Sequence, residues 1–255
     1  MSHLLATIII LVLTFTGLLF TQRQLRFEIQ GILLILTKNR ELTNTVFALL
    51  FLPGVFLHET SHYVTAKLLG VRTRRFSLLP KPLPSGNIRL GYVEIEATDI
   101  FRESLIGLAP FLSGLVVLTY IVFYQLRLGT IVIQDLLKSF GLGGYLGNFS
   151  NQPDFWIWLY LGLTISNMMF PSEADRKAWF PVILIGVILV VIGVIFGLGE
   201  WFWGRFGLRV TQFFDFLEIL FGFALLINFV PMIILWPSRI ILSWITHSSV
   251  VRTDR

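Results

Sequence analysis

The chain has 255 residues, of which 55% are hydrophobic and only 14% are charged, and its net charge is +5. A soluble domain contains roughly a quarter charged residues, so this composition excludes an ordinary water-soluble globular protein. The modest positive charge suits lysines and arginines in loops that face lipid headgroups, and we expect no nucleic-acid partner. The chain contains no cysteine, which excludes disulfides and thiolate-ligated metal sites.

Six long uncharged runs predict an all-α polytopic membrane protein, with residues 1–255 forming a single membrane-embedded domain. Each run is long enough, or nearly so, to cross a hydrocarbon core of about 30 Å at about 1.5 Å per helical residue. The lipid bilayer is therefore an expected partner. The expected spans are residues 3–20, 45–69, 102–126, 155–171, 179–198 and 212–236.

The first span is expected to be retained, because no basic segment precedes it and no small-residue cleavage site follows it.

The segments next to these spans predict two interfacial elements. Basic residues bracket the short apolar run 31–36, which cannot cross a bilayer and predicts a helix at the membrane interface. The stretch 201–209 carries two tryptophans and two arginines and predicts another interfacial segment.

Residues 71–99 break the helical pattern between the second and third spans. Prolines and the tripeptide at 85–87 (SGN) are typical of turns, and residues 88–97 alternate between apolar and polar. This pattern predicts a short β-hairpin, with a bulge near Tyr92 and Val93 where the alternation slips. An exposed strand edge at 88–97 can hold an extended peptide by main-chain hydrogen bonds.

The second span carries a metal-binding pattern. His58 and His62 are four residues apart, so a helix places them on one face, and Glu59 is offset by one position. Two imidazoles that bind a metal, and a glutamate that takes a proton from water, form the site of a zinc hydrolase. His62 lies roughly 12 Å and His58 roughly 18 Å inside the end of this helix. Ionisable groups at such a depth in lipid are costly and usually functional. The sequence predicts Zn²⁺ on His58 and His62, with Glu59 as the catalytic base.

A catalytic zinc ion needs a third protein ligand. The second and fourth spans are separated by one crossing, so they are predicted to run parallel and to finish on the same side. The end of the fourth span then brings Glu173 and Asp175 toward His62, and either carboxylate fits the position. Asp215 and Glu218 begin the sixth span on the opposite side, and we interpret them as carboxylates that face the interface or the bundle.

Three stretches resemble the site-2 proteases, a family of intramembrane zinc metalloproteases. Residues 56–71 (FLHETSHYVTAKLLGV) resemble the zinc-binding helix of that family, and residues 108–114 (LAPFLSG) resemble the small-residue stretch of its next span. Asn167, Pro171 and Asp175 resemble its asparagine–proline–aspartate signature. The resemblance is strongest over residues 43–178.

The resemblance implies a zinc endopeptidase that hydrolyses a peptide bond in or near a transmembrane segment of a membrane-protein substrate. It also implies that Asp175 is the third metal ligand and that Asn167 binds the substrate backbone. This sequence departs from the family pattern in placing Pro171 one position late and Arg176 where glycine is usual. Glu173 therefore stays the alternative ligand.

Two other functions are compatible with the sequence. A non-catalytic membrane protein could keep the site to bind zinc or a client helix, although a purely structural site has no use for Glu59. A zinc peptidase of another polytopic family would take its third ligand from a glutamate on a later span. For either kind of protease, the loops on the side of the active site carry slightly more lysine and arginine than the loops on the opposite side. This difference favours an active site that faces the cytoplasm.

Overall fold

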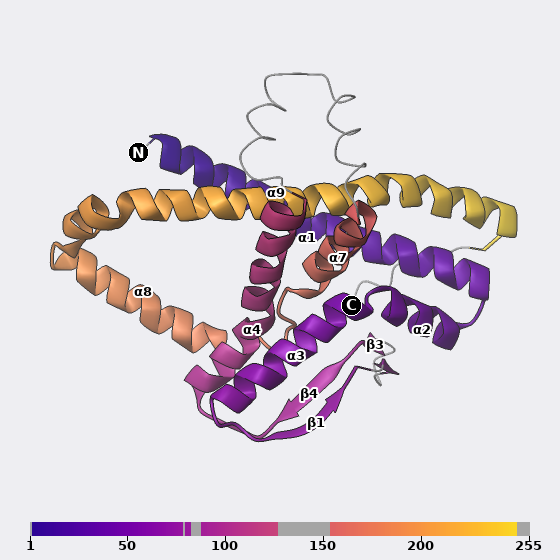
Figure 1. Cartoon of the computed structure of the whole chain (residues 1–255), viewed down its shortest axis with the longest axis horizontal. Coiled ribbons are helices and arrows are strands. Elements are labelled where there is room, and N and C mark those ends of the chain that lie inside the picture. The colour runs from indigo at the N-terminus through magenta and orange to yellow at the C-terminus, as the bar shows by residue number, and fades with distance from the viewer. Residues whose placement is uncertain (1, 79, 83–87, 127–153, 249–255) are drawn as a thin grey trace.

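The computed structural model of the chain describes residues 2–78, 80–82, 88–126 and 154–248. Two long helices lie side by side along one edge of the molecule (Figure 1), α1 (Ser2–Thr37) and α9 (Leu198–Thr246). The remaining helices lie beneath this pair: α2 (Arg40–Leu50), α3 (Leu52–Leu68), α4 (Ile100–Thr119) with its π-helical extension η1 (Tyr120–Gln125), α7 (Phe155–Met168) and α8 (Trp179–Ile195).

The structure is mainly helical, as expected, but it has fewer candidate spans than six. Within the described ranges, three helical stretches are long and apolar enough to cross a membrane: 4–37, 100–125 and 198–246. The pair α2 and α3, bent by 73° at their junction, gives a fourth if it is counted as one span. With 14 and 17 residues, α7 and α8 are shorter than the roughly 20 residues that a span needs. Several long apolar helices thus support a multi-pass membrane protein.

The predicted break after the first span is wrong, because α1 continues as one helix of 36 residues. Several of its polar side chains are paired with other helices. Gln22 donates to the carbonyl of Ser166 at 2.8 Å, and the fully buried Glu28 forms an ion pair with Arg239 of α9. Polar groups that are satisfied inside the protein need no water, so the helix does not have to leave the bundle. The interfacial segment expected at 201–209 is likewise part of α9.

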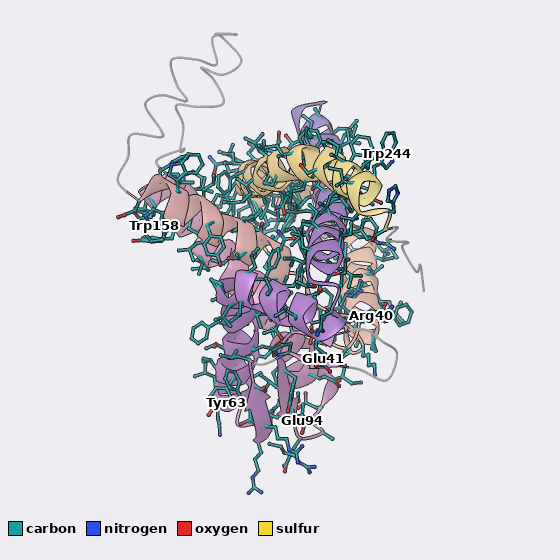
Figure 2. The ribbon with its side chains drawn as sticks, turned by 90° about the vertical axis from the view of Figure 1, so that its right-hand side faces the viewer. Arg40, Glu41, Tyr63, Glu94, Trp158 and Trp244 are labelled. Atoms are coloured by element: carbon teal, nitrogen blue, oxygen red, sulfur yellow. The ribbon has the colours of Figure 1, made fainter. Side chains whose placement is uncertain are left out.

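The predicted hairpin between the second and third spans is confirmed. Strand β1 (Thr73–Ser77) pairs antiparallel with β4 (Tyr92–Ile95), and the short β2 (Lys81–Pro82) pairs with β3 (Ile88–Arg89). The irregular register lies between Thr73 and Arg75, on the strand opposite the expected bulge. The hairpin lies along α3 at the end of the molecule away from α1 and α9, which Figure 2 shows by Glu94 at one end and Trp244 at the other.

Besides a small cluster that joins Ala66 of α3 to Ile106 of α4, two hydrophobic clusters hold α3 and its neighbours. The larger one forms where α1, α4, α7 and α9 meet, around Leu18, Leu118, Ile165 and Leu220. The smaller one joins α2 to α3 through Phe47, Phe51 and Val55. The helix that carries the predicted metal ligands is therefore packed on more than one side.

Candidate metal centre

Helix α3 turns one face toward the protein interior. Its buried residues include Val55, Glu59, His62 and Ala66, which recur every three or four positions. That spacing is the period of a helix with one buried face. A proline in the first turn suits the start of the helix, and Gly70, with a φ of 72°, ends it and turns the chain toward β1. The metal-ligand pattern therefore lies in the middle of a well-defined helix.

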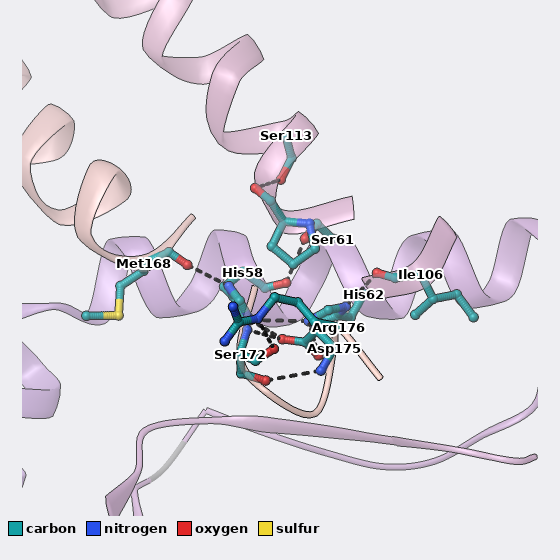
Figure 3. A network of polar contacts seen from close by, with 10 residues as sticks. His58, Ser61, His62, Ile106, Ser113, Met168, Ser172, Asp175 and Arg176 are labelled. Carbon is teal, nitrogen blue, oxygen red and sulfur yellow. Dashed lines mark hydrogen bonds and ion pairs between the residues drawn. The ribbon is translucent and has the colours of Figure 1, made fainter. Parts of the chain in front are cut away.

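The two histidines of α3 meet an aspartate from the segment between α7 and α8 (Figure 3). The Nε2 atoms of His58 and His62 lie 3.2 Å apart. The Asp175 carboxylate lies 3.3 Å from Nε2 of His62 and 3.8 Å from Nε2 of His58. Among the described residues this is the one group of three such side chains close enough to share an ion. In a tetrahedral zinc site, neighbouring ligand atoms lie about 3.4 Å apart. The three side chains thus fit a zinc ion.

Backbone carbonyls orient both imidazoles. Nδ1 of His58 lies 2.6 Å from the Met168 carbonyl, and Nδ1 of His62 lies 2.8 Å from the Ile106 carbonyl. A carbonyl oxygen can only accept, so each Nδ1 donates its hydrogen and each Nε2 is directed at the shared centre. Met168 is the last residue of α7, and its carbonyl has no partner within that helix. The free end of α7 therefore fixes the His58 ring.

The third side chain is held by a tight turn. The backbone N–H of Ser172 donates to Oδ2 of Asp175 at 2.7 Å, and the N–H of Asp175 donates to Oγ of Ser172 at 3.3 Å. Burial raises the pKa of Asp175, but the adjacent His62 imidazole and the hydrogen bonds from Ser172 outweigh this effect and lower that pKa to about 2. The carboxylate is ionised at neutral pH, as a metal ligand has to be.

Two glycines let the elements of the site approach one another. A Cβ on Gly107 of α4 would lie 2.2 Å from the carbonyl oxygen of Asp175. A Cβ on Gly54 of α3 would lie 2.2 Å from the carbonyl oxygen of Thr164 in α7. Both positions therefore require glycine, because any side chain would separate the helices or push away the Asp175 turn. The sequence indicated small residues in α4, but it did not connect Gly107 with Asp175.

A cavity of about 420 Å³ opens onto the three side chains. Glu59 lines it and is 7% exposed. Gly91, just before β4, passes over this carboxylate so closely that a Cβ would lie 2.7 Å from Cγ of Glu59. Val93 and Ile95 line the cavity together with Gly91, as expected for alternate residues on one face of a strand. The hairpin therefore forms one wall of the cavity.

The structure separates the other predicted carboxylates from the metal-ligand group. Glu173 is exposed and does not line the cavity. Asp215 accepts a hydrogen bond from the Thr7 hydroxyl at 3.2 Å, so it lies between α9 and α1. Glu218, on the same helix, belongs to no metal-ligand group of the described residues.

Asn167, the predicted substrate-binding residue, also lines the cavity. Its Nδ2 donates to the Leu163 carbonyl and to Oδ1 of Asn228, and Asn228 in turn donates to the Ser166 hydroxyl. Its Oδ1 is buried and has no partner among the described residues. The side chain therefore keeps one acceptor for a further N–H group.

Arg26 is a cavity residue that the sequence did not assign to the site. It lies on α1, one helical turn after Gln22, and both side chains reach the end of α7. The sequence pattern placed Arg26 in a segment outside the bundle. The turn-to-turn spacing of Gln22 and Arg26 was the available signal for an inward-facing polar stripe.

Comparisons with known protein families, with curated proteins and with solved structures found no match for this chain. The resemblance to the site-2 proteases rests on the short motifs quoted above and stays a hypothesis. The function of the protein is therefore inferred from the chemistry of its own residues.

Proposed function

We propose that the protein is an intramembrane zinc metalloendopeptidase that hydrolyses a peptide bond in or near a transmembrane segment of a membrane-protein substrate. One observation carries this proposal. The side chains of His58, His62 and Asp175 converge at the spacing of metal ligands, and the Glu59 carboxylate lines the same cavity. Three protein ligands leave a fourth position open, as in catalytic zinc sites.

Each residue of the site has a separate task in this reaction. When bound, a zinc ion acts as a Lewis acid that makes water a nucleophile near neutral pH. His58, His62 and Asp175 would hold that ion. Glu59 takes the proton from the attacking water and passes it to the leaving amine. A site that only held a metal would gain nothing from a buried carboxylate beside the ligands, which favours catalysis over a structural role.

The walls of the cavity suit an extended peptide. A transmembrane helix has to unwind before one of its carbonyl carbons can reach the nucleophile. Strand β4 pairs with β1, and in the described part of the chain no strand pairs with its other edge. A substrate segment added to that edge would lie along the cavity and bond through its main chain. Oδ1 of Asn167 would then accept a backbone N–H of the substrate.

Metal analysis together with cleavage of a membrane-spanning peptide tests this proposal. The purified protein should contain zinc and cleave the peptide. Asp175→Ala should lose both zinc and cleavage, because two imidazoles alone hold the ion weakly. Glu173→Ala is the matched control and should keep both, because Glu173 is exposed outside the group. Zinc retained in Asp175→Ala and lost in Glu173→Ala would assign the ligand to Glu173. A zinc-loaded protein that cleaves no peptide would support the non-catalytic alternative.

A further inference from the structure

Helix α1 contributes a cation to the cavity. The partly buried Arg26 lines the same cavity as the metal-ligand group. Its Nη1 donates to the carbonyl of Asn167 at 3.0 Å, which occupies one of its five N–H donors. Among the described residues no carboxylate forms an ion pair with Arg26, although Glu59, Glu103 and Asp175 line the cavity too.

A second arginine of the bundle shows the contrast. Arg239 of α9 is paired with the fully buried Glu28 of α1 and lies over the Phe27 ring. Its charge is therefore compensated within the protein, and its role is to join the two helices. An arginine inside a membrane bundle without such a compensating anion is costly, and residues of this kind usually face a substrate pathway. Arg26, open to the cavity, fits that description.

The hydrogen bonds at the end of α7 limit the distance from Arg26 to the metal-ligand group. Arg26 binds the Asn167 carbonyl, and His58 binds the carbonyl of the next residue, Met168. The guanidinium is therefore connected to Nε2 of His58 by two hydrogen bonds, one peptide unit and one imidazole ring. The distance between the two groups is at most roughly 12 Å. An extended chain rises about 3.3 Å per residue. A substrate group within about three residues of the cleaved bond lies within reach.

We propose that Arg26 is a specificity residue that binds a carboxylate of the peptide substrate, close to the cleaved bond. This inference rests on the proposed peptidase function. The planar guanidinium matches a carboxylate geometrically, and such charge-assisted bonds strengthen in a cavity shielded from bulk water. The carboxylate belongs either to an acidic side chain within the substrate or to the end of the substrate chain.

A purely structural alternative makes a different prediction. Basic side chains commonly bond to the last carbonyls of a helix, and Arg26 does so at Asn167. If that were its whole role, its loss would loosen the end of α7 and reduce the turnover of every substrate in the same proportion. A role in specificity changes the ratio between substrates instead.

The experiment compares matched peptides in detergent micelles with wild-type protein, Arg26→Gln and Arg23→Gln. Each peptide is one apolar spanning sequence that carries Glu or Gln at one position within three residues of the cleaved bond, with its C-terminus either free or amidated. Arg23→Gln is the control, because it removes the same charge from the exposed face of the same helix, one turn away. We measure kcat/KM for each peptide, and the Kd of each peptide for the same proteins carrying Glu59→Gln.

Wild type and Arg23→Gln should prefer the Glu peptide, or the free terminus, by roughly 10- to 100-fold, the usual size of a charge-assisted hydrogen bond. In Arg26→Gln this ratio should fall to about one. A preference for the free terminus over the amide would assign the carboxylate to the chain end. An unchanged ratio in Arg26→Gln would overturn the inference. If no variant cleaves any peptide, the proposed function fails. The Kd ratios then decide alone, and equal Kd values for Glu, Gln and both terminal forms would also overturn the inference.

Discussion

The substitution Gly107→Ala tests whether α4 positions the third metal ligand. In the structure, a Cβ at this position would lie 2.2 Å from the carbonyl oxygen of Asp175, whereas an ordinary contact is 3.4–4 Å. The Asp175 turn must therefore retreat by more than about 1 Å. Metal–ligand distances tolerate changes of about 0.2 Å. We expect the affinity for zinc to fall by about 10- to 100-fold, as when the groups that support a ligand are removed.

A competition titration with a chelator measures this loss of affinity. Gly222→Ala is the matched control, since it adds the same methyl group to a helical glycine with nothing within 4 Å of the new Cβ. Thermal unfolding of the zinc-free variants separates a local displacement from general destabilisation. If Gly107→Ala binds zinc as tightly as wild type while it folds normally, Asp175 is not held as described or is not a ligand.

Two further substitutions concern the hairpin. Gly91→Ala should slow cleavage while zinc stays bound, because the new methyl group would lie 2.7 Å from Cγ of Glu59 and displace the base without touching a ligand; a normal rate would show that Glu59 tolerates the shift. Val93→Pro should also impair cleavage without releasing zinc, because proline removes a main-chain donor from β4. Equal cleavage by the proline variant would mean that the hairpin edge does not hold the substrate.

The central part of the site was predictable from the sequence because its pattern is local. The four-residue spacing of His58 and His62 determines that they share a helix face, and Glu59 follows from its position between them. The hairpin was also predictable, since prolines and turn residues interrupt an otherwise apolar chain. The structure confirms the hairpin and brings Asp175 to the two histidines.

The remaining features depend on contacts between distant segments. Charged residues marked the expected end of the first span, yet Glu28 pairs with Arg239, more than 200 residues away, and α1 continues. The function of Gly107 is visible only once α4 meets the Asp175 turn. The number of spans was overestimated because apolar runs of 14 to 17 residues resemble short spans until their helical ends are known.

The most direct test of the proposed function is the Glu59→Gln variant, assayed for zinc content and for cleavage of a membrane-spanning peptide. Glutamine keeps the shape of the side chain but cannot take the proton. The variant should therefore retain zinc as wild type does, while its cleavage rate falls by at least about 100-fold. A Glu59→Gln protein that binds zinc and cleaves at the wild-type rate would contradict the proposal that this chain is a zinc metalloprotease.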